Sequence, residues 1–197
     1  MLLLIIKNKM KIKYNANKFY HGLKIIINNE PYSIENHELF KPGKGQTIVR
    51  VKLRKLKDGK LIKKTLKSTD SVKSANILDI NAIYLYNDTK IWYFMNKFNF
   101  DQIAIKKKII LKKIKWLSPK IKYTITLWNK NAISINIPNF INLTVIETEP
   151  CKNENINKNT KIAKLNNGIK IKIPLFVKNG NIIKIDTRNK KYISRIK

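Results

Sequence analysis

The sequence predicts an all-β chain of small barrels in series with one short helix. Three observations support this prediction. Apolar and polar residues alternate with a period of two over many short runs, turn signals recur at intervals of roughly 8–12 residues, and a single stretch has a helical period. Short strands joined by frequent turns are typical of barrels and sandwiches.

The first barrel is predicted over residues 12–74, after an N-terminal extension at residues 1–11. Apolar residues alternate cleanly with polar ones over residues 47–53. The Asp58-Gly59 pair that follows predicts a hairpin with a type I′ turn, which requires positive φ at both central residues. A returning strand is expected directly after this turn.

A second barrel is predicted over residues 75–138 and a third over residues 139–197. The helix is expected at residues 101–117 of the second barrel, where apolar residues fall near one helical face and lysines fall elsewhere. Asn99 or Asp101 is in position to cap this helix.

The charge of the chain points to a polyanionic partner. The formal net charge is +30, from 42 Lys and Arg residues against 12 Asp and Glu residues. Such a surplus is typical of proteins that bind RNA, DNA or an anionic membrane. An AT-rich codon usage would also supply many lysines, asparagines and isoleucines, so the placement of the charges is more informative than their sum.

The residues that enzymes and metal sites need are missing. Cys151 is the only cysteine, which excludes an internal disulfide and a Cys-x-x-Cys metal site. His21 and His37 lie far from it in the sequence, and the glycines around Lys44 lack the length of a nucleotide phosphate loop. We therefore expect neither an enzyme nor a metal or cofactor site.

Membrane segments are not expected either. The apolar run at residues 2–6 is too short for a signal-peptide core, which needs ~7–15 residues. No later run approaches the roughly 18 apolar residues of a membrane-spanning helix. The sequence predicts a cytoplasmic protein without a membrane partner.

Two features carry positive charge in a specific arrangement. Arg50, Lys52 and Arg54 alternate with apolar residues, which places the three cations on one face of a strand about 6–7 Å apart. This spacing suits contact with an RNA backbone, although a solvated strand face has the same pattern. In addition, Lys44 lies between two glycines after a proline, which predicts a thin hairpin tip with one projecting cationic arm or, alternatively, an ordinary hairpin lysine.

Many separate motifs then resemble one family. They appear in this order: "GLKIIINNEPYSI", "FKPGKGQTIVRVKLRKL", "KSTDS", "YLYND", "WYFMN", "TLWN", "PNF", "KIPLFV" and "IKIDTRNKKYISRIK". With this order and spacing, the chain resembles bacterial elongation factor P over about residues 14–197.

The resemblance implies a fold and a function. It implies an N-terminal KOW/SH3-like barrel and two OB-type barrels, arranged in an L shape that imitates tRNA. It further implies a monomeric translation factor that binds both ribosomal subunits between the peptidyl and exit tRNA sites. Such a factor promotes peptide-bond formation at polyproline stretches, with the peptidyl-site tRNA, especially prolyl-tRNA, as its partner.

The resemblance also implies roles for individual residues. Lys44 matches the tip residue that relatives modify with a β-lysyl group, which would require a lysine-modifying enzyme. The matching tip loop consists of Lys41, Pro42, Gly43, Gly45 and Gln46. Two further residues, Tyr192 and Arg195, match positions near the tRNA anticodon stem and the small subunit.

The chain departs from the family pattern at two places. A Gly-Asp-Thr motif that relatives place near the exit-site codon is absent from the loop expected at residues 151–159. We therefore expect little dependence on that codon. Residues 1–9 precede the usual start, so Met10 is an alternative first residue.

Other functions remain open at this stage. A structural ribosomal protein or another basic RNA-binding barrel would share the charge and the fold without needing the glycine-flanked lysine. A membrane-surface protein would use the basic helix instead, and an elongation factor P-like paralogue would share most motifs.

Overall fold

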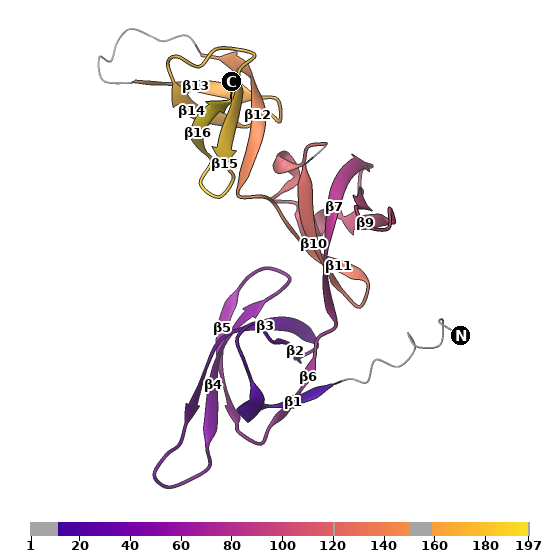
Figure 1. Ribbon diagram of the computed structural model, residues 1–197, viewed down its shortest axis with the longest axis vertical. Coiled ribbons are helices and arrows are strands. Elements are labelled where there is room, and N and C mark those ends of the chain that lie inside the picture. Colours follow the sequence, from indigo (N-terminus) through magenta and orange to yellow (C-terminus); the bar gives the residue numbers. More distant parts are fainter. Residues whose placement is uncertain (1–11, 120, 150–158, 197) are drawn as a thin grey trace. The chain divides into compact units, whose positions relative to one another are not determined.

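The structure consists almost entirely of β-strands (Figure 1). This computed structural model describes residues 12–119, 121–149 and 159–196. The strands form three sheets, each from a continuous stretch of chain, and the described residues contain one α-helix of four residues. The predicted all-β class with one short helix is confirmed.

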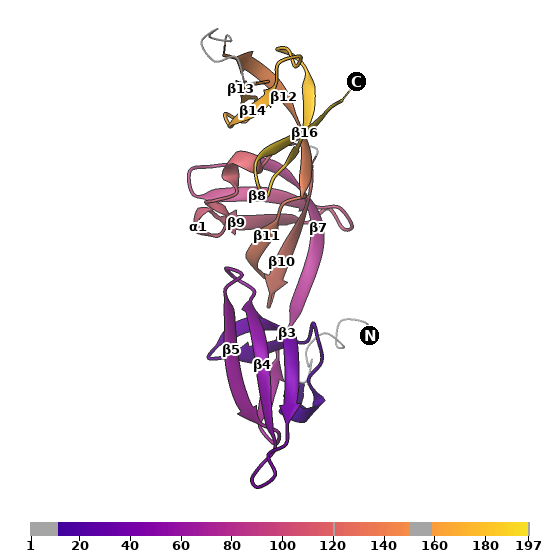
Figure 2. The same cartoon turned by 90° about the vertical axis from the view of Figure 1, so that its left-hand side faces the viewer.

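The N-terminal domain is a six-stranded antiparallel sheet. Its strand order is β1-β6-β2-β3-β4-β5, and a 3₁₀ turn, η1 (Ala16–Lys18), follows β1. The strands are β1 (Lys13–Asn15), β2 (Lys24–Ile27), β3 (Glu30–Phe40), β4 (Ile48–Lys55), β5 (Leu61–Lys67) and β6 (Ser71–Ser74). In both views β3, β4 and β5 run side by side, and the β3–β4 connection extends past the end of the sheet (Figures 1 and 2).

The core of this domain follows the period-two pattern of its strands. Along β4 the buried side chains alternate with exposed ones, and Leu53 is fully buried. Ile25 of β2 and Ile34 of β3 are buried in the same cluster. The β2–β3 connection is a tight turn, because Asn28 and Asn29 both have positive φ, at 50° and 57°.

The β4–β5 hairpin is present, but the type I′ turn predicted at Asp58-Gly59 is wrong. Only Gly59 has positive φ, at 78°. The Gly59 N–H donates to the carbonyl of Lys55, and the Lys55 N–H donates to the carbonyl of Lys60, at 2.9 and 2.8 Å. Asp58 stabilises this longer loop through its side chain, which accepts a 3.0 Å hydrogen bond from the Lys60 N–H.

The middle domain is a five-stranded sheet with the order β11-β10-β7-β8-β9. Its elements are β7 (Ile77–Asn87), β8 (Ile91–Asn96), β9 (Gln102–Lys106), α1 (Lys107–Ile110), the 3₁₀ turn η2 (Ile114–Trp116), β10 (Lys122–Trp128) and β11 (Asn131–Asn136). Phe94 and Tyr123 are almost completely buried, and their rings meet edge to face at 5.9 Å.

The helix predicted over residues 101–117 is largely wrong. Residues 102–106 are strand β9, in which Ile105 pairs with Trp92 and is fully buried. Leu111, one of the apolar residues within the predicted helix, is 61% exposed. Residues 102–106 therefore form a strand although their apolar residues also fit a helical period. Only residues 107–110 are α-helical.

The predicted helix caps are also wrong. The residue at the N-cap of α1 is Lys106, which makes no side-chain cap bond. Asn99 and Asp101 lie instead in the β8–β9 turn, where the side chain of Asn99 donates to the Asp101 carboxylate. They stabilise a hairpin rather than a helix terminus.

The C-terminal domain is a second five-stranded sheet, with the order β14-β13-β12-β15-β16. Its strands are β12 (Phe140–Thr148), β13 (Thr160–Leu165), β14 (Lys170–Pro174), β15 (Ile182–Asp186) and β16 (Lys191–Ile196). Leu165, Ile173 and Ile183 are fully buried at its centre. Trp116 also belongs to this cluster and is 7% exposed, so the segment after α1 is part of the C-terminal core.

The described residues group into two compact units. One takes the described residues within 12–79 together with Thr126–Ser134, and the other takes the described residues within 80–125 and 135–196. This division cuts through the middle sheet. The domain limits 12–74, 75–138 and 139–197 therefore stay a prediction.

Candidate functional site

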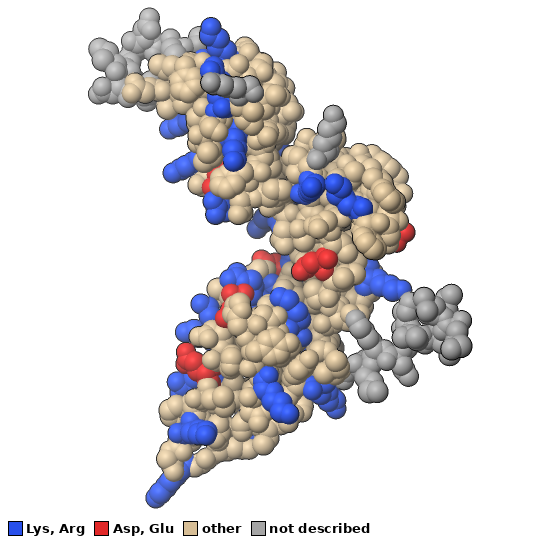
Figure 3. All heavy atoms as spheres, viewed as in Figure 1, with Lys and Arg blue, Asp and Glu red and all other residues tan. Residues whose placement is uncertain are grey.

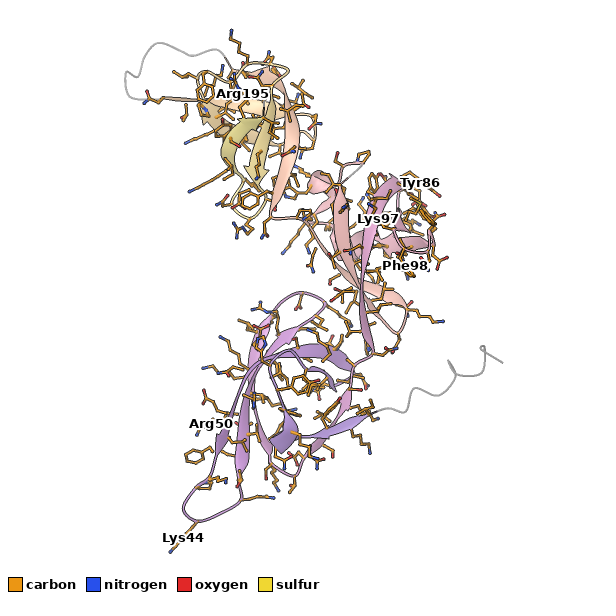
Figure 4. All side chains as sticks on the ribbon, in the orientation of Figure 1. Lys44, Arg50, Tyr86, Lys97, Phe98 and Arg195 are labelled. Atoms are coloured by element: carbon orange, nitrogen blue, oxygen red, sulfur yellow. The ribbon has the colours of Figure 1, made fainter. Side chains whose placement is uncertain are left out.

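The loop between β3 and β4 presents Lys44 at its outer end. The two strands remain paired up to Phe40 and Ile48, and residues 41–47 close the connection. Lys44 is exposed and points away from the sheet (Figure 4). It forms no ion pair with any described residue. The lysine of the sequence prediction is therefore at the tip of a hairpin, as its glycine-flanked position suggested.

The base of this loop is fixed by hydrogen bonds. The side chain of Gln46 donates to the hydroxyl of Thr69 at 3.2 Å, and the Ser68 N–H donates to the carbonyl of Thr47 at 3.0 Å. Both partners lie in the β5–β6 turn. The loop is thus held at its C-terminal side.

The two glycines of the tip have different roles. Gly45 has φ +114°, a conformation that residues with a side chain rarely adopt. A Cβ there would meet Cγ of Pro42 at 3.7 Å, which is an ordinary contact, so the restriction at Gly45 comes from the backbone. Gly43 has no such φ, and a Cβ there would meet open space. Gly43 therefore keeps the tip thin, whereas Gly45 shapes it.

The predicted basic face exists on β4. Arg50, Lys52 and Arg54 are exposed and alternate with buried residues. On the face drawn in Figure 3, basic side chains are spread over this domain and acidic ones are few. The surface between β3, β4 and β5 is hollowed into a groove of about 500 Å³, lined by Asn36, Glu38, Arg50, Val51, Lys52, Lys63, Lys64 and Thr65.

The three predicted cations on β4 have different surroundings. The guanidinium carbon of Arg50 lies 5.0 Å from the centre of the Phe40 ring, at the base of the tip loop. Lys52 lies directly opposite Lys63 of β5. Neither Arg50 nor Lys52 forms an ion pair with a carboxylate of the described residues.

Arg54 is different because it is already paired. Its Nε lies 2.8 Å from Oε1 of Glu35, at the point where a bulge interrupts the β3–β4 ladder. The hydrogen bond from Arg54 lowers the pKa of Glu35, and Glu35 raises the pKa of Arg54. A phosphate would have to compete with this carboxylate, so Arg54 is the weakest of the three predicted RNA contacts.

The two predicted residues of the C-terminal domain lie on β16. Tyr192 is half-buried and packs against the core of its sheet. Arg195 is exposed, with its guanidinium carbon 5.8 Å from the centre of the Phe176 ring. Arg195 is therefore the more accessible of the two side chains. The predicted codon loop at residues 151–159 lies, except for Asn159, outside the described residues.

The described part of the chain offers no evident metal site. Among these residues no group of three or more His, Cys, Asp or Glu side chains could hold a metal ion. No described helix is long and apolar enough to cross a membrane. What the site offers is shape and positive charge.

Sequence reasoning missed two features of the surface. Lys63 was overlooked, although the alternation along β5 places it on the same face as Lys52. The exposed aromatic side chains Tyr86, Phe98 and Phe100 were also overlooked. Two phenylalanines beside Asn99 in a turn are a signal that could have been noticed.

Comparisons with known proteins assign the chain to a family. The family model "Elongation factor P (EF-P) KOW-like domain" matches residues 15–72, "Elongation factor P (EF-P) OB domain" matches residues 77–135, and "Elongation factor P, C-terminal" matches residues 141–195. The three matches follow each other in order and account for most of the chain.

Two solved structures are similar to this chain. The structure of eukaryotic translation initiation factor 5A from Methanococcus jannaschii is 17% identical, with a TM-score of 0.50 over 64% of this chain and 94% of that one. A translation initiation factor eif-5a family protein from Naegleria fowleri is 12% identical, with a TM-score of 0.49 over 64% of this chain and 98% of that one. The first of these likenesses supports the predicted β-barrel fold, and the ordered family matches show that the chain belongs to the elongation factor P family of translation factors.

Proposed function

We propose that this protein binds the ribosome between the peptidyl and exit tRNA sites and promotes peptide-bond formation at consecutive prolines. Interaction with the ribosome is the general property of the family to which the chain belongs. The observation that supports the specific role is Lys44, an exposed cation at the thin tip of a loop whose base is hydrogen-bonded.

Lys44 would act by ordering the CCA end of the peptidyl-tRNA. Proline reacts slowly because its ring fixes φ and restricts the approach of the reacting groups. A cationic arm beside the tRNA end would restrict its motion and so reduce the entropic part of the barrier. The bond-forming chemistry belongs to the ribosome in this proposal, so the protein acts as a factor and not as an enzyme.

A β-lysyl group on Lys44 fits this role. The modification would lengthen the arm and keep it cationic, and the free tip of the loop leaves room for a modifying enzyme. An intact-mass measurement of the protein from its native cell tests this part directly. An unmodified mass would mean that the lysine acts without extension.

The basic groove on β3–β5 would hold the tRNA backbone. Arg50, Lys52 and Lys63 lie in one lining and have no carboxylate partner among the described residues. Phosphate contacts position a protein without reading sequence, which suits a factor that serves many tRNAs. Arg195 of the C-terminal domain would add a further phosphate contact, and Tyr192 would add a hydrogen bond through its hydroxyl.

Peptide-bond rates test the proposal. Purified protein is added to ribosomes stalled on a message with three consecutive proline codons, and on a matched message without them. We expect faster synthesis on the first message only. Equal rates with and without the protein on the proline message would contradict the proposal.

A structural ribosomal protein is the main alternative. It would share the fold and the charge but would stay bound when ribosomes are washed. A factor held mainly by charge leaves ribosomes in high salt, because each phosphate contact releases counterions. Sedimentation through a high-salt cushion therefore separates the two functions.

A further inference from the structure

The middle domain exposes aromatic side chains that the proposed function does not use. Phe98 is 93% exposed, Phe100 is 71% exposed and Tyr86 is 53% exposed. We call these three residues the aromatic patch. They come from the end of β7 and from the β8–β9 turn (Figure 4). Phenylalanine is among the residues most often buried, so rings this exposed call for an explanation.

The turn that carries Phe98 is ordered. The Phe98 N–H donates to the side-chain oxygen of Asn96 at 2.9 Å, and the Phe100 N–H donates to the carbonyl of Asn96 at 3.0 Å. The Asp101 N–H donates to the side chain of Asn99 at 3.2 Å. The ring of Phe98 is therefore presented on a fixed backbone, which reduces the entropy lost when a partner binds.

Phe100 has an unusual backbone conformation in this turn. Its φ is +59°, a region that residues with a Cβ enter at a cost of about 1–2 kcal/mol. The ring it carries is exposed, so burial in the core does not offset that cost. Strained residues with exposed side chains are a recurrent feature of binding sites.

Tyr86 is held with one face covered. Its ring stacks on Tyr93, with centres 4.7 Å apart and planes inclined by 29°. Its hydroxyl accepts a 2.9 Å hydrogen bond from the side chain of Gln102, two residues beyond Phe100. This bond connects β7 to the strand that follows the Phe98 turn. About half of the Tyr86 surface remains exposed for a partner.

The chemistry around the rings favours a nucleic acid. Lys97 directly precedes Phe98 in the turn and is exposed. Asp101 is the acidic residue of the turn, and its carboxylate is bonded to Asn99. Aromatic faces beside lysines are the usual means of binding unstacked bases and their phosphates. In addition, β8 and β9 are the second and third strands of this OB-type sheet, the strands that bind oligonucleotides in such folds.

We propose that the aromatic patch binds an unpaired segment of RNA, with Phe98 as a platform on which a base stacks. An apolar protein partner would need a continuous apolar surface. Here polar residues, Lys97 and Asn99, flank Phe98 in the sequence, and the Tyr86 hydroxyl accepts a hydrogen bond from Gln102, so the patch is not purely apolar. Separate rings between polar groups suit separate bases along a strand.

The test uses the purified full-length protein and a labelled oligoadenylate of about ten nucleotides, a length that OB-type domains accommodate. Fluorescence anisotropy gives its affinity, and double-stranded RNA of equal length serves as the reference. We expect Phe98→Ala to weaken binding of the single strand by between about 5-fold and 100-fold. Binding of the duplex should not change, because its bases are not accessible. Equal affinity of Phe98→Ala and wild type for the single strand would overturn the proposal.

Conservative variants separate stacking from apolar contact. Phe98→Tyr keeps the aromatic face and should bind the single strand like wild type, whereas Phe98→Leu keeps apolar bulk and should bind like Phe98→Ala. If Phe98→Leu bound the single strand as tightly as wild type, the proposal that a base stacks on Phe98 would be overturned. Leu111→Ala, which removes a similarly exposed side chain elsewhere in the domain, should have no effect. If sedimentation showed that Phe98→Ala dissociates a dimer, the occupant would be a second copy, which also contradicts the proposal. This test contains no ribosomes and does not depend on Lys44, so its outcome is independent of the proposed function.

Discussion

Lys52 on β4 lies directly opposite Lys63 on β5 in the antiparallel ladder. Like charges at such positions destabilise a sheet, by roughly 0.2–1 kcal/mol. The same face carries Arg54, whose Nε forms an ion pair with Oε1 of Glu35 at 2.8 Å. The unfavourable pair Lys52–Lys63 therefore lies within the groove, whereas Arg54, outside the groove lining, is compensated by a carboxylate. This difference is what the proposed contact between the groove and an RNA backbone requires.

The first prediction concerns this groove. The double variant Lys52→Ala/Lys63→Ala should bind ribosomes more weakly and lower the slope of log affinity against log salt by about 0.7–0.9 for each lost phosphate contact. Arg50→Ala should act in the same direction. Arg54→Ala should change the slope less, because Glu35 already compensates its charge. The measurement is a filter-binding titration at several salt concentrations. An unchanged slope in the double variant would show that this face does not meet phosphate.

The β4 face was predictable because strand alternation is a local property. Val49 and Val51 are buried in the core. Because successive side chains of a strand point to opposite faces, Arg50 and Lys52 are exposed. The pairing of Arg54 with Glu35 was not predictable, because it depends on a bulge in β3 that brings a residue from another strand into reach. Partners across strands require the register, which a single sequence does not provide.

The helix at residues 101–117 failed for a different reason. Lysines there are long enough to occupy the outer face of either a strand or a helix, so their pattern does not distinguish the two. Burial of Ile105 against β8 determines the outcome, and that is a tertiary contact. The exposed Phe98 was missed for the converse reason, since burial is the normal expectation for phenylalanine.

The second prediction separates the two tip glycines. Gly45→Ala should distort the loop, because its φ of +114° strains any residue with a Cβ, at a cost of about 1–3 kcal/mol. Gly43→Ala should leave the backbone unchanged, since open space surrounds that position. Hydrogen exchange of the loop amides and relief of proline stalling report the difference. Equal behaviour of both variants would mean that the tip conformation has no role.

The third prediction concerns stability at high pH. Burial raises the pKa of Tyr123 to about 12. An unfolded tyrosine has a pKa of about 10. The folded state therefore holds the proton more tightly, so the stabilisation is complete below pH ~10 and is lost as the pH rises from there through about 12. Thermal melts between these values should show this loss in wild type.

A single variant isolates the contribution of that hydroxyl. Tyr123→Phe should remove this part of the pH dependence and lower the free energy of unfolding by about 1–3 kcal/mol, because the Ser118 N–H loses its acceptor at 2.8 Å. Tyr20→Phe, which changes a tyrosine that is 52% exposed, is the matched control. An identical alkaline transition in wild type and Tyr123→Phe would contradict the assignment.

The fourth prediction concerns β16. Arg195→Ala should weaken ribosome binding without changing the melting temperature, because the side chain is exposed and covers only the Phe176 ring. Tyr192→Phe should keep its packing against the core and lose about 0.5–1.5 kcal/mol of binding free energy, the contribution of one hydrogen bond. Full binding by both variants would leave Tyr192 as a core residue and Arg195 as a solvated one.

The proposed role of Lys44 is tested most directly by measuring how well variants of the tip loop relieve stalling. Lys44→Ala and the control Lys41→Ala each remove one exposed lysine from the same loop, so they change the charge equally. Toeprints on a message with three proline codons, combined with ribosome pelleting, compare activity with binding. We predict that Lys41→Ala relieves the stall, whereas Lys44→Ala pellets with ribosomes as wild type does and leaves the stall in place. If Lys44→Ala relieved the stall as well as wild type, Lys44 would not be the residue that orders the peptidyl-tRNA.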